Sequence, residues 1–382
     1  YLEDGVLVGT GTGHVGDVLV NATDTSSASA RAVAGTAGII AGSGAVATAS
    51  MTSHVAAAVG DDSVIDSGSD VTVSADTTTT TAARALGINI GAGAVGASVA
   101  TATSGATTQA TLGDDVRVDA NNLTVSATRH VGAAPSALAQ ATGAAGGLLL
   151  GANATVATAS GQGTTSAEVG SGASFTVSGA TAVTADSASQ QSAAGTGVAT
   201  GFVAMGADVS IANSNTTTQA VLGDDAKVTG NTLQVSASSD DTNYAYGVAG
   251  SGGVVSAPFS KASTSNTSHT YAATGKGNNN ATSARKIDVT TLLVKADHTA
   301  TFNSWIESTN ASLVGVSGAL VTNDVSAATQ THLGTQGYVE ADNITLQASN
   351  DINKTSPSTL PGLTALDGSP LKAPAWNVKS TS

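Results

Sequence analysis

Paired aspartates in a repeated Gly-Asp-Asp sequence are the residues of this chain that could most readily do chemistry. They occur at 60–62, 113–115 and 223–225. Hard cations such as Ca²⁺ prefer carboxylate oxygens, so a stacked array could offer one carboxylate pair per repeat. Aspartate is also a common turn residue, because its side chain accepts a hydrogen bond from nearby backbone. The copy at 334–336 is Gly-Thr-Gln, without an acid, and the glycine-rich nonapeptide of calcium-binding rolls is missing. We therefore predict structural turns and no metal site.

Other catalytic and cofactor-binding patterns are weak. The glycine-rich stretches at 9–13 and 91–96 precede no helical pattern that could offer its N-terminus to a phosphate. Zinc is disfavoured, because the chain has no HExxH sequence and no histidine pair at helical spacing. Acids recur with the repeat instead of converging once, as the groove of a polysaccharide-cleaving β-helix enzyme requires. We predict a non-enzymatic protein with no catalytic residue, cofactor or metal. The six scattered histidines are His14, His54, His130, His269, His298 and His332.

These residues belong to an array of repeats. The sequence LGDDVRVDANNLTVSA at 112–127 has near-copies at 222–237 and 333–348, and weaker relatives at 59–75 and 169–185. Each copy ends in an alternation of apolar and polar residues, and these alternations begin at 18, 71, 123, 181, 233, 292 and 344. Their separations are 53, 52, 58, 52, 59 and 52 residues. Units of about 52 and 58 residues thus alternate within super-repeats of about 110, which indicates a repeat architecture.

The elements that position these residues are β-strands. An alternation with a period of two places Leu123, Val125 and Ala127 on one buried face. Consecutive strands with Gly, Asp and Asn turns and no helical period leave a β-solenoid or a string of small sandwiches. Aromatic residues make up only 3% of the chain, too few for sandwich cores. We predict an all-β, elongated parallel β-helix (β-solenoid), with two or three coils per unit and loops that bulge at one corner.

The predicted shaft covers residues 1–355, with super-repeats at about 14–122, 123–232 and 233–350. Two segments depart from it. Residues 239–290 combine Tyr244, Tyr246 and Phe259 with long polar runs, and we expect a more polar, aromatic insertion there. The alternation stops after Ser356, where four of the six prolines lie, so 356–382 is predicted to be a linker or an extended end segment.

Charge and hydropathy exclude two classes of partner. The chain has 27 acidic and 13 basic residues, a net charge of −14, so it should repel nucleic acid. No run of 18 apolar residues occurs, so we expect no membrane-spanning segment.

The repeats LGDDVRVDANNLTVSA, 59–75, 222–237 and 333–348 resemble those of very large secreted bacterial adhesins of the filamentous haemagglutinin type, including leukotoxin-like filamentous adhesins. The resemblance covers about residues 14–350. It implies a right-handed parallel β-helix shaft, export across a Gram-negative outer membrane, and roles in attachment and biofilm. An extracellular or cell-surface location follows from the same resemblance.

We therefore expect a structural and adhesive segment of a large adhesin, with a host-cell, glycan or matrix receptor as its partner. The alternative is a self-assembling extracellular filament, in which copies associate end to end or side by side; a β-helix carbohydrate-active enzyme is a third. Any N-linked sugar should lie on turn asparagines such as Asn122, Asn280 and Asn343, and not on Asn153, whose neighbours indicate a strand.

Overall fold

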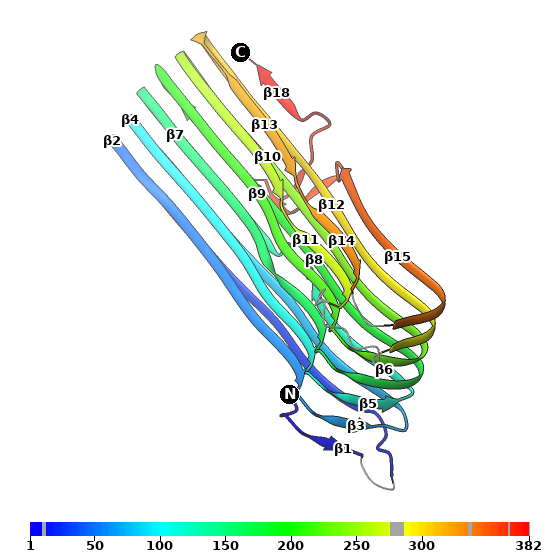
Figure 1. Cartoon of the computed structure of the whole chain (residues 1–382). Helices are drawn as coiled ribbons and strands as arrows, with labels where there is room; N and C mark the ends of the chain where they lie inside the picture. The colour runs from blue at the N-terminus through cyan, green and yellow to red at the C-terminus, as the bar shows by residue number, and fades with distance from the viewer. Residues whose placement is uncertain (10–12, 276–285, 335–337, 366, 382) are drawn as a thin grey trace.

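The chain folds as an all-β parallel solenoid (Figure 1). The computed structural model describes residues 1–9, 13–275, 286–334, 338–365 and 367–381. Sixteen strands share one sheet, whose pairings are parallel, and β16 and β17 form a separate antiparallel pair. This confirms the predicted fold class. The part of the chain that the structure describes contains no helix of the length and apolarity needed to cross a membrane.

The strands differ widely in length, and several follow the chain around a bend without interruption. They are β1 (Leu7–Val8), β2 (Val18–Val59), β3 (Val64–Asp66), β4 (Asp70–Leu112), β5 (Arg117–Ala120), β6 (Asn122–His130), β7 (Ala137–Val169), β8 (Ser174–Thr200), β9 (Val203–Leu222), β10 (Lys227–Asn266), β11 (His269–Thr274), β12 (Lys286–Gly315), β13 (Gly318–Val325), β14 (Ala328–Leu333), β15 (Tyr338–Lys354), β16 (Thr359–Thr364), β17 (Pro370–Lys372) and β18 (Val378–Thr381).

Each repeat unit forms one coil, and we number the coils from the N-terminus, so that coil one begins at Val18, coil two at Val71, coil three at Leu123 and coil four at Thr181. Val18 pairs with Val71, Val71 with Leu123, and Leu123 with Thr181, so the pairing offset equals the spacing of the sequence repeats. The expectation of two or three coils per unit is therefore wrong. The prediction failed because the Thr-, Ser- and Gly-rich stretches between the repeats do not form additional turns. They extend the same strand, so that β4 alone has 43 residues.

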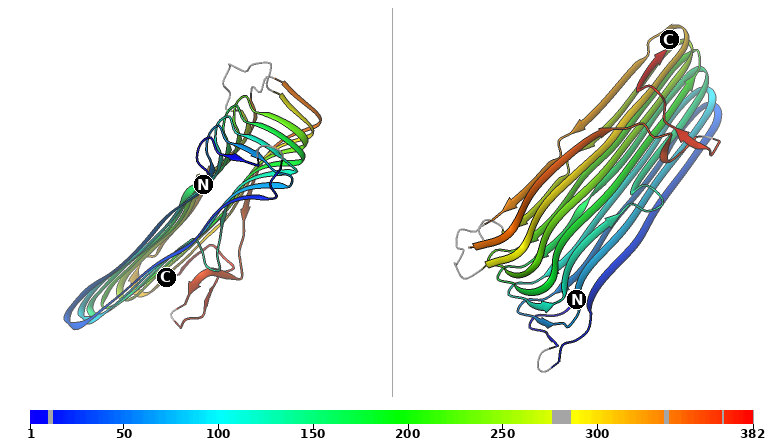
Figure 2. Two further views of the ribbon diagram at one scale, coloured as in Figure 1. Left: turned by 90° about the horizontal axis from the view of Figure 1, so that it is seen from below. Right: turned by 90° about the vertical axis from the view of Figure 1, so that its right-hand side faces the viewer.

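Each coil is long and narrow. The molecule is therefore longer in the plane of its coils than along the solenoid axis (Figure 2). About 20 residues run outward and about 20 return, which at ~3.3 Å per residue makes each coil roughly 65 Å long. Six or seven rungs at ~4.8 Å add only about 30 Å along the axis. We call the rounded end with the turns at 60–62, 113–115, 170–172 and 223–225 the base. The opposite bends, at 38–42, 91–93, 147–150, 201–203, 253–255 and 312–316, form the tip.

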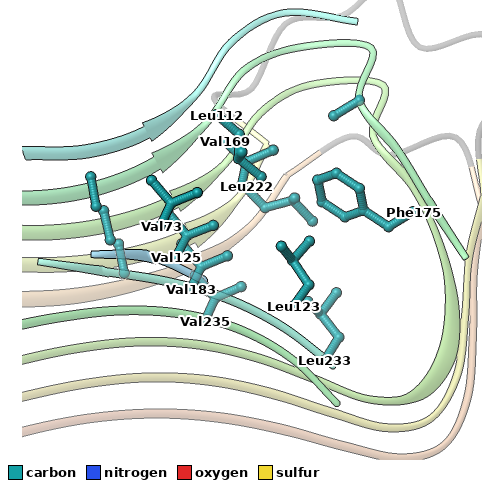
Figure 3. Close-up of a cluster of buried hydrophobic side chains, with 14 of the residues drawn as sticks. Val73, Leu112, Leu123, Val125, Val169, Phe175, Val183, Leu222, Leu233 and Val235 are labelled. Atoms are coloured by element: carbon teal, nitrogen blue, oxygen red, sulfur yellow. The ribbon is translucent and has the colours of Figure 1, made fainter. Parts of the chain in front are cut away.

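The main hydrophobic core fills the base. Leu123, Val125 and Ala127 are fully buried, as predicted, and the equivalent valines of successive coils lie in a row (Figure 3). Stacking in register places like side chains on like, so each rung repeats the packing of the last. The row labelled in Figure 3 is Val73, Val125, Val183 and Val235.

Nearer the tip the two faces of each coil approach one another, and alanine replaces valine and leucine. A second core consists almost entirely of alanine, including Ala83, Ala100, Ala139 and Ala157. Only small side chains fit between closely spaced sheets, which accounts for a chain that is 41% hydrophobic yet only 3% aromatic. Between the two cores lies a layer of buried Ser, Thr and Asn side chains, among them Thr77, Thr79 and Ser104.

The two longer units carry their extra residues at different places and not at one common corner, so the prediction of loops at one corner is wrong. His130 pairs with Thr78, 52 residues away, whereas Ala137 pairs with Thr81, 56 away. Most of the extra length of this unit therefore lies at 131–136. In the other long unit the offset changes from 52 to 59 between Thr274 and Ile287, so its extra residues lie in that interval. Residues 276–285 are outside the described part.

The segment at about 239–290, which we expected to be an insertion, forms a regular strand of the coil over its first half. Residues 239–266 continue β10, in register with β8 and β12, so this part of the prediction is wrong. The polar residues mislead because Asp241 and Asn243 point into the buried polar layer, and the aromatic Tyr244 and Tyr246 point outward from the same strand.

The proline-rich segment 356–382 was predicted as a linker or extended end, and its described part lies across one flat face of the coils. Its strands β16 and β17 form a hairpin, which we call the strap. Leu360 and Leu363 of the strap are buried against Tyr244, Tyr246 and Trp305. Tyr244 and Trp305 lie with ring centroids 5.8 Å apart. The outward aromatic residues of coils five and six are therefore the strap's docking surface.

Asparagine exposure follows the predicted inside and outside of the coil. Asn122 is exposed at the start of β6 and Asn153 is buried inside β7, whereas Asn343 is exposed but lies within β15 and not in the predicted turn. Asn280 lies outside the described residues.

Candidate functional site

The Gly-Asp-Asp sequences form the base turns, and their first aspartates bind backbone. Asp61 Oδ1 accepts a hydrogen bond from Asp114 N at 2.8 Å, and Asp114 Oδ1 accepts one from Ser171 N at 2.7 Å. Each carboxylate thus caps the turn of the next coil. The second aspartates, Asp62, Asp115 and Asp225, have φ of 54–56°, the left-handed conformation that Asp adopts at modest cost. These contacts give the acids a structural role.

Two of the second aspartates, Asp62 and Asp115, border a groove of about 630 Å³ on the base. Arg117 and Lys227 line the same groove as Asp62 and Asp115. Basic groups among the carboxylates oppose a divalent cation, because they repel it and compete for the same oxygens. Among the described residues no group of three or more His, Cys, Asp or Glu side chains could hold a metal.

The histidines are not brought together. His14 contacts Asp66 and His130 contacts Asp76, the latter at 3.3 Å, on separate exposed parts of the base and shaft. His298 lies in the buried polar layer.

A buried set of Ser189, Asp241 and His298 has the residue types of a catalytic triad. Ser189 Oγ donates to Asp241 Oδ1, and His298 Nε2 lies 4.0 Å from Asp241 Oδ2. In a triad the histidine lies between serine and carboxylate, whereas here the aspartate lies between the other two. Asp241 and His298 are wholly inaccessible to solvent. This arrangement cannot present a nucleophile to a substrate.

Asp241 instead organises polar groups inside the coil. Thr216 Oγ1 and Asn266 Nδ2 each donate to it at 3.3 Å. Burial lowers the pKa of His298, and the nearby charge of Asp241 only partly offsets this. Burial likewise lowers the pKa of the Arg129 guanidinium, which donates to Gln162 O at 3.1 Å. The cluster joins coils four to six by hydrogen bonds where the faces lack apolar side chains.

Asp208 is a second buried acid, nearer the tip. Burial raises its pKa to about 8, although hydrogen bonds from Thr155, Ser210 and Ser260 oppose the shift. The carboxyl group is therefore mostly protonated at neutral pH. Gly195 gives it space, since a Cβ there would lie 1.6 Å from Asp208 Oδ1.

Another candidate site for a ligand lies where the strap meets the first three coils. It is a pocket of about 390 Å³. Arg84 donates through Nη1 to Gln140 Oε1 and Thr364 Oγ1, each at 3.1 Å, and through Nη2 to Gly362 O at 3.1 Å. Its lining residues are Arg31, Ala32, Arg84, Ala85, Leu86, Gln140, Thr142, Thr364, Ala365 and Gly368.

The pocket is suited to an anion. Arg31 pairs in register with Arg84, so the two outward guanidinium groups stand on adjacent rungs and repel one another. Arg31 is exposed and makes no hydrogen bond or ion pair with any described residue. Its five N–H groups are therefore available to a carboxylate or sulfate, which a guanidinium binds in bidentate fashion. Ala32, Ala85 and Leu86 add an apolar wall.

Sequence reasoning missed this site, although it contained a signal. Arg31 and Arg84 are 53 residues apart, which is the repeat spacing, so they occupy the same phase in successive units. Recognising one unit as one coil would have placed them side by side. The strap residues Gly362 and Thr364 had no such signal, because the strap lies outside the repeat.

Comparisons with known proteins give no assignment: no family model matches the chain, and no curated protein or solved structure matches it significantly.

Proposed function

We propose that this chain is a non-enzymatic, structural and adhesive β-solenoid segment of a large bacterial cell-surface or secreted adhesin. The observation that carries the proposal is the uninterrupted parallel ladder, which joins every coil to its neighbours over most of the chain. Such a ladder is a stiff support that holds ligand-binding groups at fixed spacing. The resemblance of the repeats to filamentous haemagglutinin-type adhesins favours the same role.

Two further features support a binding role over catalysis. The polar groups with catalytic residue types, Ser189, Asp241 and His298, are sealed inside the coil. The accessible pocket offers Arg31 and Arg84 but no carboxylate or imidazole among its lining residues, so it has a means to bind and no acid or base for hydrolysis. We infer that the pocket binds an acidic group of a receptor, such as a carboxylate- or sulfate-bearing glycan.

Binding to polysaccharides of different charge tests this function. The chain would be immobilised and exposed to a uronic-acid polysaccharide, a sulfated polysaccharide and neutral dextran. We expect retention of an acidic polymer, weakened by salt, and none of dextran. Equal retention of dextran, or release of shortened products from any of the three, would overturn the proposal.

A substitution at Arg31 locates the binding. Arg31 makes no hydrogen bond or ion pair with the described strap residues, so Arg31→Gln should remove one guanidinium and keep the fold, and we expect at least a tenfold loss of affinity. Arg117→Gln removes an equally exposed arginine from the base and is the matched control. If both variants lose the same affinity, general charge and not the pocket accounts for the binding.

The alternative, a self-assembling filament, rests on the outermost strands. Among the described residues, β2 pairs along its length with β4 and otherwise only through the Leu2–Val59 bridge, and β15 pairs with β12 alone, so each leaves backbone groups that a second copy could pair with. Sedimentation over a range of concentrations separates the two proposals, because a filament grows with concentration and the adhesive segment stays monomeric.

A further inference from the structure

The tip carries a row of exposed, large apolar side chains that no function considered above uses. Ile39 and Ile40 are 83% and 89% exposed on the first coil, and Leu148 is 76% exposed on the third. On the second coil the bend itself is Gly-Ala-Gly, with the exposed Ile90 and Val95 on either side. We call this row the apolar ridge: Ile39, Ile40, Ile90, Val95, Leu148, Leu149, Phe202, Val255, Leu313, Val314 and Val316.

The ridge is free of charge on every coil. No Asp, Glu, Lys or Arg occurs in 32–60, 85–113, 130–167, 242–260 or 308–323. In the fourth coil the interval 187–223 contains one, Asp208, which is buried and largely protonated at neutral pH. Apart from the strap and the segment after it, the charged residues therefore lie at the base and in the middle of the coils. If the exposed apolar residues were scattered by chance, charged residues should occur among them, and they do not.

Backbone polar groups at the tip are largely satisfied within the protein. The parallel ladder continues around the bend: Gly38 pairs with Gly91 and Ile40 with Gly93. Where the register shifts, Phe202 N donates to Leu148 O at 3.2 Å, and Val255 N donates to Phe202 O at 3.0 Å. A segment can enter a hydrocarbon environment only when its N–H and C=O groups are paired. The inner coils of the tip meet this condition, unlike an ordinary apolar loop, while the outermost strands, β2 and β12, keep open backbone groups at the two ends of the row.

The dimensions of the ridge favour lipid over a protein partner. Six rungs at ~4.8 Å make it roughly 25–30 Å long, but a single bend is only about 10 Å wide. A stable protein interface of about 800 Å² on each partner extends over roughly 25–30 Å in both directions, so this strip is too narrow for one. A narrow, convex, uncharged edge can instead penetrate about 5–10 Å into the boundary between headgroups and acyl chains. Apolar side chains on such an edge gain by leaving water without requiring a complementary surface.

We propose that the apolar ridge is a lipid-binding edge, by which the solenoid rests tip-first on a membrane surface. The base and the strap pocket then face away from the lipid. Because the ridge is uncharged and the chain is acidic, binding needs no anionic lipid and is weakened by it.

Flotation with vesicles tests the proposal. We expect the chain to float with phosphatidylcholine vesicles, to a similar extent at low and high salt, and less with vesicles that also contain phosphatidylglycerol. The ridge variant carries Ile39→Ser, Ile40→Ser, Leu148→Ser and Leu149→Ser, and we expect at least a tenfold lower bound fraction. All four side chains are exposed, so the fold should be kept, and equal circular dichroism melts of variant and parent check this.

The matched control carries Leu7→Ser and Leu19→Ser, which are 64% and 67% exposed near the base. It should float like the parent. Failure of the parent to float, or equal loss in the ridge and control variants, overturns the proposal. Self-association of the parent that the ridge variant abolishes, without flotation, would assign the ridge to a second copy and also overturn it. None of these outcomes depends on the Arg31 pocket, so adhesion to glycans and lipid binding are tested separately.

Discussion

At the scale of single residues, the buried acid Asp208 makes stability depend on pH. Its pKa is about 8 in the folded chain, against an ordinary value of 3.8, because burial disfavours the charged form. Between these two values the folded state binds a proton that the unfolded state has lost. The free energy of unfolding therefore falls as the pH rises from about 4 to about 8.

We predict that Asp208→Asn removes this dependence. Asparagine imitates the protonated acid and stays neutral, so the variant should match the parent near pH 4 and exceed it at pH 8–9, by as much as about 5 kcal/mol. Denaturant unfolding at a series of pH values measures the difference. Asp186→Asn, at an exposed position of the same coil, is the control and should follow the parent. Parallel profiles for parent and Asp208→Asn would contradict the prediction.

At the scale of elements, the strap is the one part of the described chain that packs outside the ladder. It is attached by Leu360 and Leu363 and by the hydrogen bonds of Arg84 and Gln140. The coils beneath it have their own cores and do not depend on it.

We predict that Leu360→Ser together with Leu363→Ser detaches the strap and leaves the coils folded. Each substitution removes a fully buried leucine, at about 2–3 kcal/mol, from a hairpin too short to be stable alone. Limited trypsin digestion should then cleave at Lys372 much faster, while the thermal transition of the coils stays in place. Thr359→Ser, at an exposed strap position, should digest like the parent. Loss of the main transition would instead make the strap part of the core.

At the scale of the whole molecule, one repeat per coil makes a broad, flat solenoid, which we call the blade, and its two edges, the base and the tip, differ in chemistry. The base carries charged turns and the largest core side chains; the tip carries alanine inside and the apolar ridge outside. The proposed functions follow from this polarity, since the pocket of Arg31 and Arg84 and the ridge lie on different parts of the blade.

The register of the blade can be tested by a disulfide, because the chain has no cysteine of its own. Ser74 and Ser126 pair on adjacent rungs and both point outward, so Ser74→Cys with Ser126→Cys should oxidise to an intramolecular bridge. Ser74→Cys with Thr184→Cys spans two rungs, about 10 Å, and should stay reduced. If a unit held two or three coils, the first pair would also be too distant to bridge. Non-reducing electrophoresis distinguishes the two results.

The sequence by itself determined the local structure and the inside of the coil. Period-two alternation identified Leu123, Val125 and Ala127 as buried, and the aspartate turns were recognisable because turn chemistry is local. The repeat spacing of 52 to 59 residues was also visible, and it equals the sequence offset between paired residues of neighbouring coils.

Only the tertiary structure decided how many coils a unit makes, because alternation continues unchanged through a gentle bend and does not mark it. For the same reason the apolar ridge was hidden: Ile39 and Leu148 have the composition of core residues, and their exposure depends on the direction of the bend. The pocket needed the strap to fold back across 280 residues of sequence separation from Arg84 to Thr364. Contacts of that range depend on packing between surfaces, which no local pattern records.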